Sequence, residues 1–302
     1  MRFVALLVVP AFVGACGGSE AATPTTTVRD SAGVTIVENR GDGTVWADRH
    51  PWVVPDEPVL RIGEMEGEEP YQLFRVSDVL RLPDGRVVVA NGGSGELRFF
   101  DADGRYLMSA GRKGSGPGEF ESLGPIVLVG DSIAAYDWRL RRISVFDTSG
   151  AFGRSYDLRF PSGSPRPVGA FADGRWLAAT NMVFRPAQMS GVRRDTAAYF
   201  VFSAEGTEYD SLFTFPSWEF YLEGDDQFVV ARSLPFSRGP HQAVFADGFW
   251  AGVTDRYEIG RYAPDGTLEL LLRREHTHLP VTDAHLAAYR EDVLESLDSD
   301  NQ

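Results

Sequence analysis

The stretch LPDGRVVVANGGSGELRFFDADGRYL (82–107) contains two tight-turn signals, and each lies between short runs of strand-forming residues. Both signals recur, and the two series alternate along the chain. The first series comprises LPDGRVVVA (82–90), VGDSIAAYD (129–137), FADGRWLAA (171–179) and FADGFWAGV (245–253). The second comprises FFDADGRYL (99–107), VFDTSGAFG (145–153), VFSAEGTEY (201–209) and RYAPDGTLE (261–269). The body of the chain is therefore a repeat.

Each repeat unit predicts four strands, A to D, with tight A–B and C–D turns and looser connections elsewhere. From first-series to second-series glycine the steps are 19, 20, 32 and 18 residues (85 to 104, 130 to 150, 174 to 206 and 248 to 266). Such a sheet cannot bury its apolar faces alone, and radial stacking of sheets covers them. A β-sandwich is the alternative, but sandwiches rarely repeat the same two turns at near-constant spacing. We therefore predict an all-β protein, a β-propeller of four-stranded antiparallel blades over residues 31–280.

The segment AGRKGSGPGEF (110–120), followed by GPIVLVGDSIAAYDWRLRRISVFDTSG (124–150), resembles an NHL-type repeat. It is similar in particular to six-bladed β-propeller lipoproteins of bacterial envelopes, and the resemblance covers about 31–297. PVLRIGEMEGEEPYQLFRV (58–76) resembles a weaker copy of the same inter-blade segment, which would close an earlier blade, and SAGVTIVEN (31–39) would add a strand.

The number of blades departs from this resemblance. Six blades are implied, whereas the sequence shows four clear units and a partial one. Either further blades lie outside this sequence, which we favour, or the ring is smaller or open. An unclosed ring would expose apolar blade faces and favour aggregation.

The glycine-rich segment suggests a phosphate-binding loop. In such a loop the lysine follows the glycines, whereas Lys113 comes before Gly114, Gly116 and Gly118. Because the segment recurs in weaker form at 63–76, we predict a hinge between blades instead. The residues assigned to this structural linker are Gly111, Gly114, Gly116, Pro117, Gly118, Glu119 and Phe120.

The N-terminus predicts export. Residues 1–15 combine Arg2 with an apolar run from Phe3 to Val13, as in a signal peptide. Val13-Gly14-Ala15-Cys16 resembles the bacterial lipobox, and Cys16, the only cysteine, is the expected lipidation site. An ordinary export signal is the alternative. Residues 16–30 are expected to be a flexible tether, which places the protein on a bacterial membrane, in the outer membrane facing the periplasm or at the cell surface.

The net charge of −14 argues against nucleic acid as a partner. The only membrane contact that we expect is the lipid anchor. The B–C loops and the D-to-A connections should share one face, where propellers of this family generally bind ligands. Insertions at 181–195 and 217–242 enlarge that face, and arginines and aromatic residues gather in it. The candidate ligand-binding residues are Trp138, Arg139, Arg141, Arg142, Arg185, Arg193, Arg194, Trp218, Tyr221, Arg232, Arg238 and His241. Arg112, Lys113, Phe184, Phe220, Phe236 and Arg256 would border them.

Such residues suit an anionic or sugar-like ligand or an envelope protein. The alternative is that the arginines pair with local acids, such as Glu119, Glu219, Asp225 and Asp226, and only fix the loops. We expect a non-enzymatic binding module, with a purely structural module as one alternative.

The other alternative is a propeller enzyme, a metal-dependent lyase or lactone hydrolase with a site in the central channel. The inner strands offer only Ser77, Asp78 and His241, and no catalytic residue, metal site or cofactor is predicted. His276 and His278 alternate along a strand but have no third ligand at a diagnostic spacing. Asp101-Ala102-Asp103-Gly104 is predicted to be a turn rather than a calcium loop.

Two further expectations concern particular residues. Asn91 and Asp137 end their B strands, and the resemblance implies that this position holds the B–C loop through backbone N–H groups; a catalytic carboxylate at Asp137 is the alternative. Residues 281–302 predict a helix and tail, with Asp283 as the cap. Leu286, Tyr289, Val293 and Leu297 would form its apolar stripe.

Overall fold

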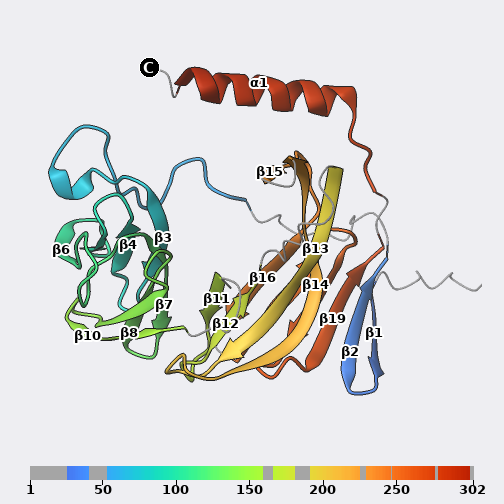
Figure 1. Ribbon diagram of the computed structural model, residues 1–302, viewed down its shortest axis with the longest axis horizontal. Coiled ribbons are helices and arrows are strands. Elements are labelled where there is room, and N and C mark those ends of the chain that lie inside the picture. Colours follow the sequence, from blue (N-terminus) through green and yellow to red (C-terminus); the bar gives the residue numbers. More distant parts are fainter. Residues whose placement is uncertain are drawn as a thin grey trace, which may run out of the picture.

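The computed structural model describes residues 26–40, 53–158, 166–180, 191–224, 229–245, 247–275 and 278–299. They form four sheets, which follow one another in chain order and which we call blades 1 to 4 (Figure 1). Within each blade, consecutive strands pair in an antiparallel manner. The predicted all-β, blade-type architecture with a C-terminal helix is confirmed.

Blades 1 and 2 have four strands each, in sequence order. Blade 1 contains β3 (Val76–Arg81), β4 (Val87–Asn91), β5 (Glu96–Phe100) and β6 (Tyr106–Ala110). Blade 2 contains β7 (Leu123–Val129), β8 (Ser132–Asp137), β9 (Arg142–Asp147) and β10 (Phe152–Asp157).

Blade 3 has five strands, because the insertions continue its sheet. It contains β11 (Arg166–Ala170), β12 (Trp176–Ala179), β13 (Gly191–Phe202), β14 (Tyr209–Gly224) and β15 (Val229–Ser233). Treating 217–242 as a loop connection was wrong: residues up to Gly224 stay paired with β13, and β15 pairs with the end of β14. In WEFYLEG (218–224) the apolar Trp218, Phe220 and Leu222 alternate with Glu219, Tyr221 and Glu223, and this period of two with several aromatic residues explains the strand.

Blade 4 is extended by the N-terminal hairpin. It contains β16 (Pro240–Phe245), β17 (Gly248–Val253), β18 (Glu258–Tyr262) and β19 (Leu268–Arg274). Next to β19 lie β2 (Val34–Asn39) and β1 (Thr26–Ser31), and β2 runs parallel to β19. The strand predicted in 31–39 is therefore present, whereas β1 begins within the range expected to be a tether.

The repeated turns have the expected hydrogen bonds. In the A–B turn of blade 1, the N–H of Gly85 donates to the carbonyl of Leu82, 2.9 Å away, and in the C–D turn the N–H of Gly104 donates to that of Asp101, 3.0 Å away. Gly150, Gly174, Gly206 and Gly266 close the corresponding turns in the other blades. Asp101 accepts N–H groups from Asp103 and Arg105, so this segment is a turn.

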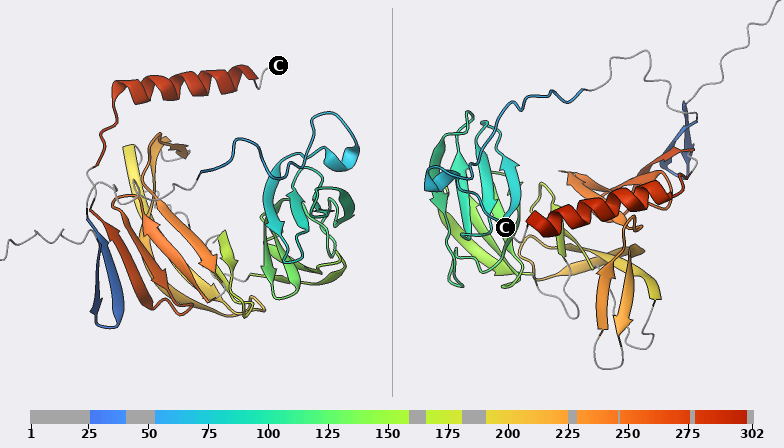
Figure 2. Two further views of the ribbon diagram at one scale, coloured as in Figure 1. Left: turned by 180° about the vertical axis from the view of Figure 1, so that it is seen from behind. Right: turned by 90° about the horizontal axis from the view of Figure 1, so that it is seen from above.

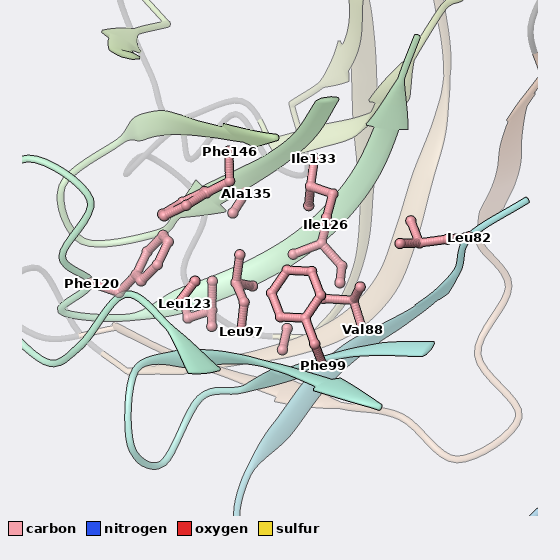
Figure 3. Close-up of a cluster of buried hydrophobic side chains, with 12 residues drawn as sticks. Leu82, Val88, Leu97, Phe99, Phe120, Leu123, Ile126, Ile133, Ala135 and Phe146 are labelled. Atoms are coloured by element: carbon pink, nitrogen blue, oxygen red, sulfur yellow. The ribbon is translucent and has the colours of Figure 1, made fainter. Parts of the chain in front are cut away.

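The core lies between consecutive blades. Figure 3 shows Val88, Leu97 and Phe99 of blade 1 converging on Ile133 and Phe146 of blade 2, and all five are buried. Similar clusters join blade 2 to blade 3 around Trp176 and blade 3 to blade 4 around Phe249. The inner strands contact one another in the order β3, β7, β11, β16, and blades 1 and 4 lie at the two ends of the row (Figures 1 and 2).

The helix α1 (Asp283–Ser299) lies apart from the sheets (Figure 2). Its Tyr289 ring is 6.1 Å from the ring of Phe236, in the loop before β16. The expected cap was wrong: the hydroxyl of Thr282, not Asp283, accepts the N–H of His285, because Thr282 is the last residue before the helix. The part of the helix stripe whose side chains are described remains half-buried or exposed.

The packing between blades 1 and 2 predicts the effect of removing one buried aromatic ring. Phe99→Ala should lower the free energy of unfolding by about 3–5 kcal/mol, because it leaves a cavity between two sheets. Leu107→Ala on the exposed side of β6 is the matched control, with an expected change below about 1 kcal/mol. Urea denaturation measures both, and equal effects would contradict this description of the core.

Candidate ligand-binding face

The B–C turns and the links between blades emerge at the same end of the sheets, since the strands alternate in direction. We call this end the loop face. In blade 2 it is built by the linker from β6 to β7, residues 111–122, and by the turn from β8 to β9, residues 138–141.

The linker 111–122 is closed by its own hydrogen bonds. The N–H of Gly114 donates to the carbonyl of Phe120 (3.0 Å), and that of Phe120 donates to the carbonyl of Arg112 (2.9 Å). The Glu119 carboxylate accepts the N–H of Gly116 and pairs with the Arg112 guanidinium, and these two contacts hold the pKa of Glu119 below its usual range. Phe120 is 1% exposed and packs between blades 1 and 2. The segment acts as a packed linker.

Asp137 holds the linker against the B–C turn. One carboxylate oxygen accepts the N–H groups of Glu121 and Ser122 (2.8 and 2.9 Å), and the other accepts those of Arg139 and Leu140 (both 2.8 Å). The side chain is 1% exposed. Both oxygens are thus occupied, which supports the tying role and not a catalytic one.

The ends of two other B strands repeat this device. Asn91 in blade 1 accepts the N–H of Phe74 through its side-chain oxygen, at 2.7 Å. Thr254, directly after β17, accepts the N–H of Gly239 at 2.9 Å. A short polar side chain at this position therefore ties the loop face together in several blades.

Most candidate arginines have a partner close by. Arg142 donates to the carbonyls of Ser115, Gly116 and Glu119 in the linker. The ion pairs are Arg139 with Glu121, Arg194 with Asp255, Arg232 with Glu223, Arg238 with Glu219, and Arg256 with Glu258. For the five ion-paired arginines the structure favours the alternative of pairing with local acids. Asp225 and Asp226, which that alternative also named, lie outside the described residues.

The remaining candidates fall into two groups on different blades. The first is in blade 2, where Arg141 makes no hydrogen bond or ion pair with the described residues and has a positive φ of 54°. Trp138 is half-exposed, and its ring meets Tyr136 edge to face with centroids 5.0 Å apart. The Arg166 guanidinium lies over the Trp138 ring, 5.4 Å from its centroid.

The pKa of Tyr136 is affected by the charges of Arg141, Arg166 and Asp137. Burial raises the pKa of the Tyr136 hydroxyl, and the nearby Asp137 carboxylate acts in the same direction, whereas the Arg141 and Arg166 guanidiniums oppose it. Both guanidiniums therefore act on the same small region. Our sequence reasoning missed Arg166, which begins β11. The register of the A strands could have identified it.

The second group belongs to the border of blades 3 and 4. The Trp218 and His241 rings meet edge to face at 5.1 Å, and Tyr221 lies opposite Arg232 across β14 and β15. Arg193 lies opposite Phe220, and its buried Nε finds no hydrogen-bond partner among the described residues. Arg185 and Phe184 lie outside the described residues. The described candidates thus lie in two groups, one around the B–C turn of blade 2 and one at the border of blades 3 and 4.

The candidate channel residues Ser77 and Asp78 form hydrogen bonds with backbone groups of their own and the neighbouring strands. The Ser77 hydroxyl donates to the carbonyls of Ala90 and Gly124, and the Asp78 carboxylate accepts the N–H groups of Val79 and Ile126. Within the described ranges, no three histidine, cysteine or acidic side chains are grouped closely enough to hold a metal ion. Across those same ranges, no helix is both long and apolar enough to cross a membrane.

The role of Asp137 predicts a stability effect. Asp137→Asn places an amide NH2 against two backbone donors, so the free energy of unfolding should fall by about 2 kcal/mol or more. Asp131→Asn, at an exposed turn of the same blade, is the matched control and should change it by less than about 0.5 kcal/mol. Thermal denaturation measures both, and unchanged stability in Asp137→Asn would contradict the tying role.

Comparison with known proteins gives a family match for part of the chain. Residues 66–165 match a family described as "6-bladed beta-propeller". A search among curated proteins found no match.

Several solved structures are similar. A protein of Bacteroides fragilis described as exported has 16% identity over 74% of this chain and 58% of its own length, with a TM-score of 0.45. Virginiamycin B lyase from Staphylococcus aureus has 11% identity over 70% and 72%, with a TM-score of 0.37. A chain of a nidogen/laminin complex has 12% identity over 65% and 84%, with a TM-score of 0.36.

The family match covers blades 1 and 2 completely, and blades 3 and 4 repeat the same strand order. Residues 66–165 are therefore similar to the six-bladed β-propeller family, and the chain as a whole has a β-propeller type of fold.

Proposed function

We propose that this protein is an exported, lipid-anchored β-propeller that binds an anionic ligand or an acidic partner on its loop face. The binding residues are Trp138, Arg141 and Arg166, at the border of blades 2 and 3. The observation that carries the proposal is the conformation of Arg141. It occupies a left-handed position that glycine adopts without strain, and it makes no ion pair with the described residues.

The corresponding position of blade 1 supports this reasoning. Gly95 stands there, with a positive φ of 71°, four residues after Asn91 as Arg141 stands four residues after Asp137. A non-glycine residue in this conformation costs about 1 kcal/mol, which structures tend to tolerate at functional positions. A guanidinium held at that cost, beside a second one stacked on an indole ring, suits a carboxylate or phosphate group.

Two arginines next to the site have partners of their own within the loop face. Arg139 is neutralised by Glu121, and Arg142 is committed to the carbonyls of the linker. Arg141 and Arg166 therefore supply the positive charge of this part of the loop face, on a protein whose overall charge is −14. The enzyme alternative finds less support, because Ser77 and Asp78 are engaged in hydrogen bonds to the backbone and the His241 ring packs against Trp218.

The binding site can be tested without risk of unfolding. Arg141→Gly removes the guanidinium and relieves the backbone, so stability should be unchanged or slightly higher. The intact protein is screened by thermal shift against acidic glycans and acidic envelope peptides. Any ligand found should lose at least about tenfold in affinity with Arg141→Gly and with Arg166→Ala, the loss expected for one charge-assisted contact.

Trp218→Ala, in the second group of candidates, is the control and should leave that affinity unchanged. Absence of any anionic ligand, or a ligand indifferent to Arg141→Gly and sensitive to Trp218→Ala, would refute the assignment.

The anchor is tested separately. Cys16→Ala should release the protein from the membrane fraction into the soluble fraction, because it removes the site of acylation. Ser19→Ala in the adjoining segment is the matched control and should remain with the membrane. Tight membrane association of Cys16→Ala after an alkaline wash would refute lipidation at this residue.

A further inference from the structure

Two arginines of the loop face share an unusual backbone conformation. Four non-glycine residues in the described part of the chain have a positive φ, and two of them are Arg75 (53°) and Arg141 (54°). Arg75 lies directly before β3, in the link that leads into blade 1, so it belongs to the same face as Arg141. This conformation is costly for any residue with a Cβ, and it tends to persist where a function requires it.

The fold does not require an arginine at position 75. Its backbone carbonyl accepts the N–H of Gly92, in the B–C turn of blade 1, at 3.1 Å. Ser122 and Gly239 stand at the same place before β7 and β16, and their carbonyls accept the corresponding N–H groups at 2.9 and 3.0 Å. Serine and glycine thus meet the structural need, which leaves the arginine side chain available for another role.

The side chain of Arg75 is stacked on an aromatic ring. Its guanidinium lies over Phe74, 5.1 Å from the ring centroid, and makes no hydrogen bond or ion pair with the described residues. The Phe74 ring packs against the backbone of Gly93, where a Cβ would lie 2.4 Å from a ring carbon. The ring is nevertheless 63% exposed, so the pair lies at the surface.

The site at the border of blades 2 and 3 has the same construction. The half-exposed Trp138 packs against the backbone of Gly124, where a Cβ would lie 2.5 Å from the indole nitrogen. The Arg166 guanidinium lies over this ring as that of Arg75 lies over Phe74. Stacking restricts a guanidinium while its N–H groups remain able to bind a carboxylate or phosphate.

The two stacked pairs lie one blade apart. Phe74 precedes β3 and Trp138 covers the start of β7, and these inner strands contact each other. The Ser77 hydroxyl in β3 donates to the carbonyl of Gly124 in β7, at 3.0 Å. Between the two pairs stands Gly92, whose lack of a side chain leaves the way from one pair to the other unobstructed.

Several acidic side chains of the same links have other partners. Glu69 pairs with Arg98, and Glu121 pairs with Arg139. The Asp137 carboxylate is occupied by four backbone N–H groups. These acids therefore do not neutralise the stacked guanidiniums.

The hydrogen-bonding capacity of the combined site limits the class of ligand. Arginine side chains and the indole N–H donate hydrogen bonds and accept none, and a phenyl ring is apolar. A peptide would bring one backbone N–H with nearly every residue, and each would need an acceptor. A sugar hydroxyl accepts from such donors, the C–H groups of the sugar ring contact aromatic carbon, and a carboxylate on the sugar pairs with a guanidinium.

We propose that Phe74 and Arg75 form a second anion-binding subsite, and that the ligand of the loop face is an acidic oligosaccharide that reaches both subsites. The inference rests on the proposed function for the part formed by Trp138, Arg141 and Arg166. Neighbouring sheets pack about 10 Å apart, so an acidic monosaccharide occupies one subsite and a chain of several units occupies both. A chain should therefore bind more tightly than its monomer, because its second contact is intramolecular.

Titration calorimetry of the intact protein tests the proposal. The probes are linear tetramers of galacturonate and of guluronate, the two monomers, and an octaglutamate peptide. At least one tetramer should bind at least about tenfold more tightly than its monomer. Arg75→Gly should weaken that tetramer about tenfold, the loss of one charge-assisted contact, and leave stability unchanged or slightly higher because glycine adopts a positive φ without strain.

Arg154→Ala is the matched control. Arg154 in β10 also lies over an aromatic ring, that of Tyr156 at 5.2 Å, but on an outer strand. Its removal changes the net charge as much as Arg75→Gly does, and it should leave the affinity for the tetramer unchanged. An equal loss in both variants would overturn the subsite, since the overall charge would then account for binding.

The remaining outcomes separate this inference from the proposed function. A tetramer that is indifferent to Arg75→Gly but weakened by Arg141→Gly would overturn the second subsite and leave the proposed function standing. Indifference to both substitutions would refute the proposed function as well. Absence of binding by both tetramers, or tighter binding of the octaglutamate peptide, would overturn the assignment of an acidic oligosaccharide.

Discussion

The structure depends on one constraint, which is that the central strands of each sheet are apolar on both faces. In β4, Val88 points toward blade 2, whereas Val87 and Val89 point to the opposite side, and all three are buried. Alternating side chains of a strand reach opposite faces, so such a sheet needs a cover on each side. Stacking the sheets in a row meets this need for every blade except those at the two ends.

The linkers belong to the same core. Phe120 enters the space between blades 1 and 2, while Arg142 and Asp137 bind the backbone on either side of it. Because these contacts fix the linker, the B–C turn beside it presents Trp138 and Arg141 in one defined arrangement. The loop face can therefore vary its exposed residues without disturbing the sheets, as expected for a binding surface on a rigid scaffold.

The sequence predicted the parts of the structure that depend on local patterns. The Asp-Gly-type turns, the alternation of the two turn series and the linker around Gly114 depend on residues close in sequence, and the structure contains them. The ion pairs could not be predicted, since Arg194 and Asp255 are 61 residues apart and meet only when blades 3 and 4 pack. The length of β14 was missed because its strand-forming residues continue beyond the repeat, and Arg166 because its importance arises from Trp138 on another blade.

The central claim is that a linker and the blades on both sides of it form one packed unit. A double-mutant cycle of Phe120→Ala and Phe146→Ala tests it most directly, since one ring belongs to the linker, the other to blade 2, and their centroids are 6.0 Å apart. We predict a coupling free energy of about 0.5–1.5 kcal/mol, measured by urea denaturation of the four proteins. Additive effects of the two substitutions would contradict the claim.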